Sequence, residues 1–328
     1  MSKPLLSPGR RQVLAALGAT ALAAPFAGFA QSDRPITLIL PVSVGSGVDK
    51  ITRAGSDALA AELGRPVVVD NKPGAGGIIG TNAIVQAKPD GNTYGMVSNN
   101  HVVFPSVYKS VPFDPIADIT PVSVVGSTPF LLVVNPQRVK ARTVKEFIDE
   151  LKARPDSYNY ASSGNGTILH LAVEMFVHQA AVKARHIPYK GVGPMITDLI
   201  GGQVDFGVLA LPAVRTQVEA GSLIALGACG DHRMPQMPNL ATLAEQGLPD
   251  YECSGWFATV APAGLPAADV QRMYDALKVA FNAPEVAERM QAQGNTIINM
   301  TPEKTTEFFR SEMAKYAQIV KASGIQPV

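Results

Sequence analysis

The sequence of 328 residues is poor in charge and contains few cysteines. Only 17% of its residues are charged and its formal net charge is +1, which argues against nucleic acid or an anionic membrane surface as partner. Beyond the first thirty residues, no apolar run reaches the length of a transmembrane helix. The apolar fraction of 46% instead predicts a well-packed globular protein, long enough for two domains.

The common signatures of catalysis and of metal binding are also missing. No G-x-S-x-G nucleophile elbow occurs, and no H-E-x-x-H or close Cys/His spacing is found. The histidines are scattered along the chain as His101, His170, His178, His186 and His232. We therefore expect no catalytic residue, no metal and no cofactor, and a protein that acts by binding.

The first thirty residues are typical of an export signal peptide. Lys3, Arg10 and Arg11 precede an apolar run from Val13 to Leu22, and small residues lead to a cleavage point after Ala30. The arginine pair leaves open both general secretion and twin-arginine export. We expect residues 1–30 to be removed and the mature protein to be periplasmic, with its net charge lowered by the three lost cations.

The two cysteines, Cys229 and Cys253, both lie in apolar runs that resemble strands. In an oxidising compartment such residues either form a disulfide or remain buried free thiols. We expect both of them to be unpaired.

Predicted strands and helices alternate through the mature chain. A strand at Ile36–Leu40 precedes a helix from about Asp49 to Leu63, in which apolar residues recur with helical spacing. Near the C-terminus, the pattern predicts a short helix at Leu240–Gln246, a strand at Asn295–Met300 and a final helix opened by Thr301. Strands separated by helices of this length predict an α/β fold with mainly parallel sheets covered on both faces.

Two apolar extended stretches, Thr128–Asn135 and Tyr251–Ala261, bracket a middle block that has its own strand and helix series. They are the natural crossings between two lobes. We predict a discontinuous first lobe of residues 31–130 and 256–328, a second lobe of residues 131–255, and a ligand cleft between them.

Two loops rich in glycine and hydroxyl residues lead from predicted strands into predicted helices, at Pro41–Asp49 and Ser162–Thr167. The free N–H groups of a first helical turn converge at such a point, and glycine lets an oxyanion approach them. Either loop alone fits an ordinary helix cap. One in each predicted lobe, at the carboxyl end of a strand, indicates a binding site. A third segment, Ser98–His101, lies at the same edge as the first loop and is either part of the site or a solvated turn.

Two further features have competing interpretations. Gly74–Gly80 follows a strand and opens a helix like a dinucleotide-binding turn, but its G-x-G-x-x-x-G spacing and the preceding Pro73 favour a structural role. Asp205 begins a predicted strand, where it is either a turn carboxylate or, at a cleft edge, a partner for a ligand amine or hydroxyl.

The block Pro41–Asp49, P-V-S-V-G-S-G-V-D, resembles the P-F-x-x-G-G-x-x-D opening of the Bug receptors, the solute-binding proteins of tripartite tricarboxylate transporters. Other segments resemble that family in the same order, namely Val68–Gly77, Ala87–Tyr94, His186–Gly191, Gly201–Asp205, Gly247–Tyr251 and Gly255–Pro266. The resemblance covers essentially the whole mature chain. Val42 stands where the family usually has Phe, and Ser46 where it has a second Gly, so the cargo is not inherited from any relative.

This resemblance implies a type II periplasmic-binding-protein fold that carries a small organic acid to the permease subunits of a tripartite tricarboxylate transporter. It implies that backbone and hydroxyl groups hold the carboxylate, partly through ordered waters, without an arginine clamp. The implied ligand-binding residues are Ser43, Gly45, Ser46, Gly47, Ser98, Asn99, Ser163, Gly164, Asn165, Gly166, Thr167, His170 and Asp205. We expect a monomer. A receptor that presents its ligand to a sensor kinase and a periplasmic hydrolase are the alternatives.

Overall fold

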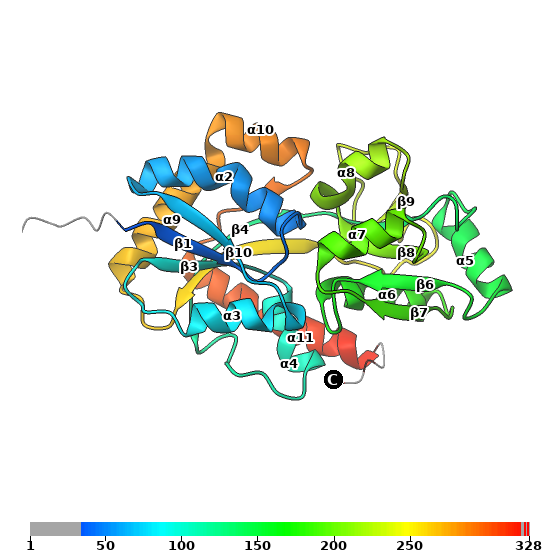
Figure 1. The fold of residues 1–328 in the computed structure, drawn as a ribbon, viewed down its shortest axis with the longest axis horizontal. Helices are drawn as coiled ribbons and strands as arrows, with labels where there is room; N and C mark the ends of the chain where they lie inside the picture. The colour runs from blue at the N-terminus through cyan, green and yellow to red at the C-terminus, as the bar shows by residue number, and fades with distance from the viewer. Residues whose placement is uncertain (1–33, 323–324, 326, 328) are drawn as a thin grey trace, which may run out of the picture. The chain divides into compact units, whose positions relative to one another are not determined.

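The computed structural model describes residues 34–322 together with residues 325 and 327. The predicted signal peptide lies outside the described residues. From Pro35 onward the chain forms one compact unit built on two β-sheets (Figure 1). In this described part, no helix is both long enough and apolar enough to cross a membrane.

The first sheet has six strands in the order β11-β4-β10-β3-β1-β2. Its strands are β1 (Ile36–Leu40), β2 (Val67–Asn71), β3 (Thr93–Ser98), β4 (Ile119–Thr128), β10 (Gly255–Pro262) and β11 (Thr296–Ile297). Its helices are α2 (Gly47–Leu63), α3 (Ile78–Val85), α4 (Asn100–Val107), α9 (Ala267–Asn282), α10 (Pro284–Ala292) and α11 (Pro302–Ala322). Figure 1 shows α2, α9 and α10 on one face of this sheet and α3, α4 and α11 on the other.

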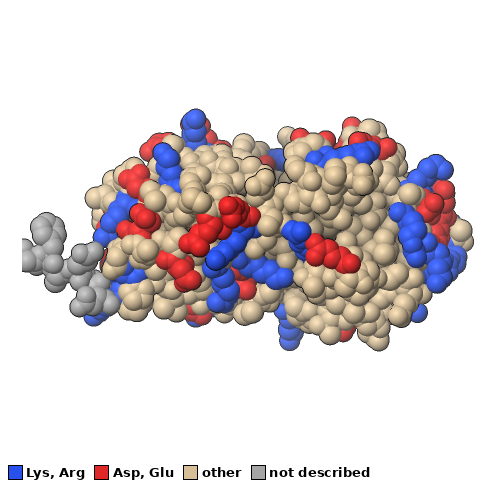
Figure 2. All heavy atoms as spheres, turned by 90° about the horizontal axis from the view of Figure 1, so that it is seen from above, with Lys and Arg blue, Asp and Glu red and all other residues tan. Residues whose placement is uncertain are grey.

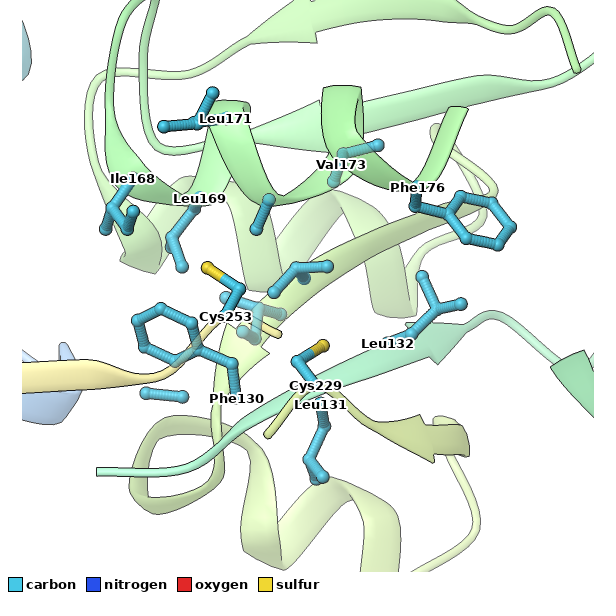
Figure 3. Close-up of a cluster of buried hydrophobic side chains, with 14 of the residues drawn as sticks. Phe130, Leu131, Leu132, Ile168, Leu169, Leu171, Val173, Phe176, Cys229 and Cys253 are labelled. Atoms are coloured by element: carbon cyan, nitrogen blue, oxygen red, sulfur yellow. The ribbon is translucent and has the colours of Figure 1, made fainter. Parts of the chain in front are cut away.

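The second sheet has five strands in the order β7-β6-β8-β5-β9. Its strands are β5 (Phe130–Val134), β6 (Asn159–Ser162), β7 (Arg185–Pro188), β8 (Phe206–Ala210) and β9 (Ile224–Ala228). Its helices are α5 (Val144–Ala153), α6 (Ile168–Gln179), α7 (Val192–Ile200) and α8 (Leu211–Glu219). Every residue of β5 and β8 is buried, because helices or loops cover both faces of these central strands. Part of the core between β5 and α6 is drawn in Figure 3.

Local sequence explains where several helices begin and end. The hydroxyl of Ser46 accepts a hydrogen bond from the N–H of Asp49 at 3.2 Å and starts α2, which ends at Gly64 in the left-handed conformation. A capping box begins α5, since Thr143 and Glu146 bond to each other's backbone N–H. These contacts fix the helix starts that lead out of the strands.

The chain passes between the two sheets in very short steps. One residue, Pro129, separates the end of β4 in the first sheet from the start of β5 in the second. The chain returns at Ser254, just before β10. The lobe boundaries that we expect from the sequence, between residues 130 and 131 and between residues 255 and 256, lie beside these crossings. The division of the chain into two lobes at these boundaries stays a prediction.

The expectation of mainly parallel sheets is wrong, because both sheets are mixed. The strands β2 and β3 run parallel to β1, and β7 and β8 run parallel to β6. The crossing strands differ: β10 is antiparallel to β3 and β4, and β5 is antiparallel to β8 and β9. A strand that enters directly from the other sheet has no covering helix before it, so the rule for strand-helix-strand units does not apply to it.

Three local predictions also need correction. The segment Leu240–Gln246 is a series of turns with one bridge from Thr242 to Ala228, and forms no helix. Of the expected strand at 295–300, only Thr296–Ile297 forms a regular ladder with β4. The next three residues still donate backbone hydrogen bonds to Val125 and Val124 of β4, but Asn299 is left-handed (φ 52°) and the regular strand does not continue. Sequence analysis also missed β4 and the short helix α4, whose internal Pro105 argues against a helix.

Candidate ligand-binding cleft

A cavity of about 670 Å³ lies between loops at the carboxyl ends of strands from both sheets. The first sheet contributes the loops after β1 and β2 and part of α4, and the second contributes the loops after β6 and β7. The lining residues are Pro41, Val42, Ser43, Pro73, Gly74, Ala75, Gly76, Gly77, Ile79, Asn100, Tyr108, Ser163, Gly164, Asn165, Thr167, Pro188, Tyr189, Lys190, Gly191 and Val192. The volume and position are typical of a site for a small molecule.

A second cavity of about 60 Å³ lies closer to the crossing strands. It is lined by residues at the ends of β3, β4 and β8 and at the start of β10, including Ser98, Thr128, Ala210 and Trp256. Ser163 and Val192 line both cavities, so the small cavity continues the large one inward. The strands β2 and β7 are the outer edges of their sheets, so the large cavity extends from the interior toward the surface.

Hydrogen bonds join the two sides of the large cavity. The Ser43 hydroxyl accepts from the N–H of Val192 at 3.0 Å, and the Tyr108 hydroxyl donates to the carbonyl of Asn165 at 2.6 Å. Burial raises the pKa of Tyr108, which keeps its hydroxyl protonated and able to donate. The two sides are therefore closed against each other in this structure.

Asn100 makes a further contact across the cavity. Its side-chain oxygen accepts from the N–H of Ile168 at 2.8 Å, at the start of α6, and its amide donates to the carbonyl of Gly76 at 2.9 Å. One side chain thus ties the loop after β2 to the helix on the opposite side. Outside the cavity, Lys50 Nζ donates to the carbonyl of Pro212 at 2.8 Å and adds another contact between the sides.

Gly76 lets the loops come this close. Its φ is +66°, and a Cβ placed there would lie 2.5 Å from the Tyr108 hydroxyl and 3.4 Å from the Asn165 carbonyl oxygen. We interpreted Gly74–Gly80 from sequence as purely structural, whereas the structure places Gly74–Gly77 in the cavity wall. Strand β2, which precedes this loop, is parallel to β1, so the loops after β1 and β2 leave the same edge of the sheet. That placement could have identified Gly74–Gly77 as part of the cavity wall.

Groups able to bind an anion line the cavity. The backbone N–H groups of Gly76 and Asn165 have no acceptor within the described part of the chain. Lys190 is the one charged residue among the lining residues, and no ion pair to it is formed by residues 34–322. No acidic side chain of the described residues lines the cavity. The arrangement favours a negatively charged ligand held mainly by neutral donors.

Buried polar contacts hold the loop after β1 in place. Asp49 accepts from the N–H of Gly45 at 2.9 Å, from Arg53 at 2.9 Å and from the amide of Asn71 at 3.0 Å. The same Asn71 amide donates to the carbonyl of Val42 at 3.2 Å. Asp49 and Asn71 therefore fix the shape of the loop that presents Ser43 to the cavity.

Thr167 has a similar role in the loop after β6. It caps α6 by accepting from the N–H of His170 at 3.3 Å, and its own hydroxyl donates to the carbonyl of Gly164 at 2.9 Å. The Ser163 hydroxyl donates to Thr167 Oγ1 at 3.1 Å. Because the hydroxyl hydrogens of Thr167 and Ser163 are both engaged within the loop, these side chains shape it, and the N–H of Asn165 stays available in the cavity wall beside them.

On the same side of the cavity, Tyr189 orients the loop after β7. Its hydroxyl donates to Asp198 of α7 at 2.8 Å, and burial together with this bond raises its pKa to about 12. Gly191 follows, where an added Cβ would lie 2.7 Å from the Ser43 hydroxyl oxygen. Sequence analysis placed this segment in a family motif but assigned no binding role to it.

The predicted site residues fall into three groups. The large cavity is lined by Ser43, Ser163, Gly164, Asn165 and Thr167, and the small one by Ser46, Gly47, Ser98, Asn99 and Ser163. Neither cavity is lined by Gly45, Gly166, His170 or Asp205. Asn99 is fully engaged by the protein, since its side chain bonds to the N–H of Trp256, the carbonyl of Ser254 and the hydroxyl of Tyr316.

The expectation that Asp205 contacts the ligand requires correction. Its carboxylate, 2% exposed, accepts from Arg138 at 2.9 Å and from the N–H of Asn159 at 2.6 Å. Asn159 begins β6 and Ser163 follows the end of that strand, so Asp205 lies at the opposite edge of the second sheet. Its partners give it a structural role, which is the alternative that the sequence left open.

Over residues 34–322, no group of three or more His, Cys, Asp or Glu side chains is arranged to hold a metal ion. Cys229 and Cys253 are free and buried in the core of Figure 3, where their sulfur atoms point in different directions. Figure 2 shows basic and acidic side chains intermixed on one face of the protein.

Two α/β halves joined by crossing strands, with a cavity between the carboxyl ends of their strands, define a solute-binding protein of the periplasmic-binding-protein class. The sequence model of the family described as tripartite tricarboxylate transporter family receptor matches residues 51–325, and this chain belongs to that family. The chain is 35% identical to protein BugT of Bordetella pertussis over 319 residues, which cover 95% of this chain and 98% of BugT. The resemblance found in the sequence is thereby confirmed.

Solved structures agree with this assignment. The periplasmic binding protein BugD superimposes with a TM-score of 0.87 at 28% identity, over 90% of this chain and 99% of that chain. A protein of R. palustris solved with adipate has a TM-score of 0.87 at 29% identity, again over 90% and 99% of the two chains. The predicted type II periplasmic-binding-protein fold is confirmed, with mixed sheets in place of mainly parallel ones.

Proposed function

We propose that this protein captures a small organic carboxylate in the cleft and delivers it to the membrane permease of a tripartite tricarboxylate transporter. The observation that carries the proposal is a cavity with unpaired N–H groups at Gly76 and Asn165 and one cation, Lys190, but no acidic lining residue among those described. A carboxylate satisfies the N–H donors, and its charge is not opposed by any side chain of the wall.

Further features support this proposal. The R. palustris relative was solved with adipate, a linear dicarboxylate. In the cavity wall, Ser43 contacts Val192 at the end of the loop after β7, which also contains Lys190. Gly76 of the loop after β2 lies beside Asn165 of the loop after β6. We propose that one carboxylate lies near the N–H groups of Gly76 and Asn165 and that Lys190, beside Ser43, attracts the other end of the ligand.

The wider organisation is part of the same proposal. We propose export through the signal peptide at residues 1–30, a periplasmic monomer, and lobes of residues 31–130 with 256–328 and of residues 131–255. The proposed binding residues are Ser43, Gly76, Ser163, Asn165 and Lys190, with the remaining lining residues shaping the cavity. The protein carries no catalytic activity in this proposal.

A thermal-shift screen of carboxylates tests the binding proposal. Because a ligand that binds only the folded protein raises the melting temperature by mass action, at least one carboxylate such as adipate should stabilise the protein. The matched diamide, adipamide, should not. Tight binding of a neutral sugar, with no response to any carboxylate, would contradict the proposal.

A lysine pair tests the placement of the ligand charge. Lys190→Met should weaken the binding of a dicarboxylate by about two- to fivefold, the range expected for one partly exposed ion pair, as measured by calorimetric titration. Lys278→Met, in an exposed position on α9, is the control and should leave affinity unchanged. Equal affinities in both variants would remove Lys190 from the site.

Delivery to a permease requires a separate test. The ligand-loaded protein should co-purify with the transporter membrane subunits from solubilised membranes, and the ligand-free protein should do so less well. Recovery of a sensor kinase in place of the permease would redirect the proposal to a signalling receptor.

A further inference from the structure

A group of buried and partly buried polar side chains lies directly behind the loop after β6, and none of its members lines the large cavity. It consists of Tyr160 and Ser162 of β6, His186 of β7, and His170 and Glu174 of α6. The rings of His170 and His186 stack with centroids 3.9 Å apart and planes inclined by 7°. The Tyr160 hydroxyl hydrogen-bonds to Glu174 beside them.

His170 contacts the binding loop through Nδ1, which accepts a hydrogen bond from the N–H of Gly166 at 3.2 Å. An imidazole nitrogen can accept only while it carries no proton, so the neutral ring must hold its hydrogen on Nε2. That nitrogen faces Glu174 Oε1 at 3.6 Å. The state of one ring nitrogen is therefore coupled to the backbone of the loop.

His186 contacts the same loop through Ser162. Its Nε2 lies 2.6 Å from the Ser162 hydroxyl oxygen, which also accepts from the N–H of Gly164 at 3.2 Å. The two imidazoles thus fix Gly164 and Gly166, the neighbours of Asn165 in the cavity wall. Asn165 in turn accepts the hydrogen bond from Tyr108 on the other side of the cleft.

We propose that His170 and His186 are positioning residues that hold the loop after β6 in its ligand-binding form while their rings are neutral, and that proton uptake by His170 weakens ligand binding. A proton on Nδ1 replaces the acceptor with a donor that faces the N–H of Gly166, so that hydrogen bond is lost. Gly166 then loses its attachment to α6, and Asn165 loses its fixed place in the wall.

His186 and Glu174, which flank His170, keep their charge states in mild acid. Burial, with a smaller contribution from His170, lowers the pKa of His186 to about 4, so the second ring stays neutral in mild acid. Burial raises the pKa of Glu174, but hydrogen bonds from His170 and Tyr160 outweigh it and leave the pKa lowered. Among the described residues, Glu174, Tyr160 and His186 are the titratable groups that face His170.

Nuclear magnetic resonance of the ¹⁵N-labelled protein tests this coupling without any ligand. Between pH 8 and pH 5, the amide resonance of Gly166 should shift with the same midpoint as the ring nitrogens of His170. In His170→Asn, the side-chain oxygen takes the place of Nδ1 and does not titrate, so the Gly166 shift should disappear. His178→Asn, an exposed histidine of the same helix, should keep the wild-type titration. A Gly166 amide shift whose midpoint differs from that of the His170 ring nitrogens would overturn the proposal. A Gly166 shift that persists in His170→Asn would do the same.

A second measurement, which rests on the proposed function, uses adipate as probe. Between pH 8 and pH 6, calorimetric titration should show an affinity loss of about fivefold in the wild type, as expected for one lost hydrogen bond. His170→Asn should change by less than about twofold under the same conditions, since adipate itself titrates equally for both proteins. Equal losses would overturn the effect on binding. If adipate fails to bind at any pH, the choice of ligand fails, and the resonance experiment still decides the role of His170.

Discussion

Replacing Gly76 with alanine tests whether the two sides of the cleft must approach as closely as the structure shows. At φ +66° the new side chain adds left-handed strain of about 1–2 kcal/mol. Its Cβ would lie 2.5 Å from the Tyr108 hydroxyl, so Tyr108 must move and its hydrogen bond to Asn165 breaks. We expect a further loss of about 1 kcal/mol in the free energy of ligand binding, which corresponds to an affinity about fivefold weaker. This further loss should not appear in the free energy of unfolding.

Gly221→Ala is the matched control for this change. Gly221 has φ +72° and no atom within 4 Å of an added Cβ, so it carries the same backbone strain without the collision. Both variants should lose a similar free energy of unfolding, measured in urea by the fluorescence of the single tryptophan, Trp256. Only Gly76→Ala should weaken the binding of the carboxylate found by thermal shift. Equal affinities for the two variants would show that Gly76 does not limit closure.

Three further predictions concern stability and the buried thiols. Thr167→Val and Thr143→Val each remove a helix cap and should each cost about 1 kcal/mol of unfolding free energy, but calorimetric titration should show weaker ligand binding only for Thr167→Val. Burial lowers the pKa of His101 from 6.5 to about 4, so the stability from its neutral ring is present above pH 6.5 and is lost as the pH falls toward 4. This loss should reach about 3 kcal/mol in urea unfolding, and His101→Gln should flatten it; a stability that is constant over this range would refute the reasoning. Burial raises the pKa of Cys229 to about 12, so both cysteines should resist alkylation in the native protein and both should react after denaturation without reductant, as a mass shift of two additions would show.

Much of the fold could be predicted because local signals agreed with each other. The strand Ile36–Leu40 has the same bounds in the structure as in the sequence prediction, and the helix predicted from about Asp49 to Leu63 ends at the same residue. Apolar runs, caps and glycine turns act within a few residues, so they are visible in sequence. The strand direction of β10 was not visible, because it depends on where the chain returns from the second sheet.

The site residues that directly follow a strand could be predicted from the sequence. The residues that reach the cavity from the opposite side of the cleft could not. Ser43 and Ser163 follow β1 and β6 and were expected to line the cleft. Tyr108 follows a helix that Pro105 concealed, and its partner Asn165 lies 57 residues away in the chain. Asn100 lies in the segment Ser98–His101, for which the sequence left both a binding role and a solvated turn open. Asp205 was misplaced because a residue before a strand lies at the opposite edge from a residue after one.

The crossing at Pro129 has a mechanical consequence for how the cleft opens. Proline fixes its own φ near −65°, so this link can bend mainly through ψ and through its neighbours. Beside it, Gly255 of β10 pairs with Thr128 of β4, so the two crossings run together and resist sliding of one half past the other. We therefore expect the cleft to open by rotation about this paired link. The strands β2 and β7 lie on the far side of their sheets from it, so we expect the loops after them, which include Gly76 and Lys190, to move farthest and to form the entrance for a ligand.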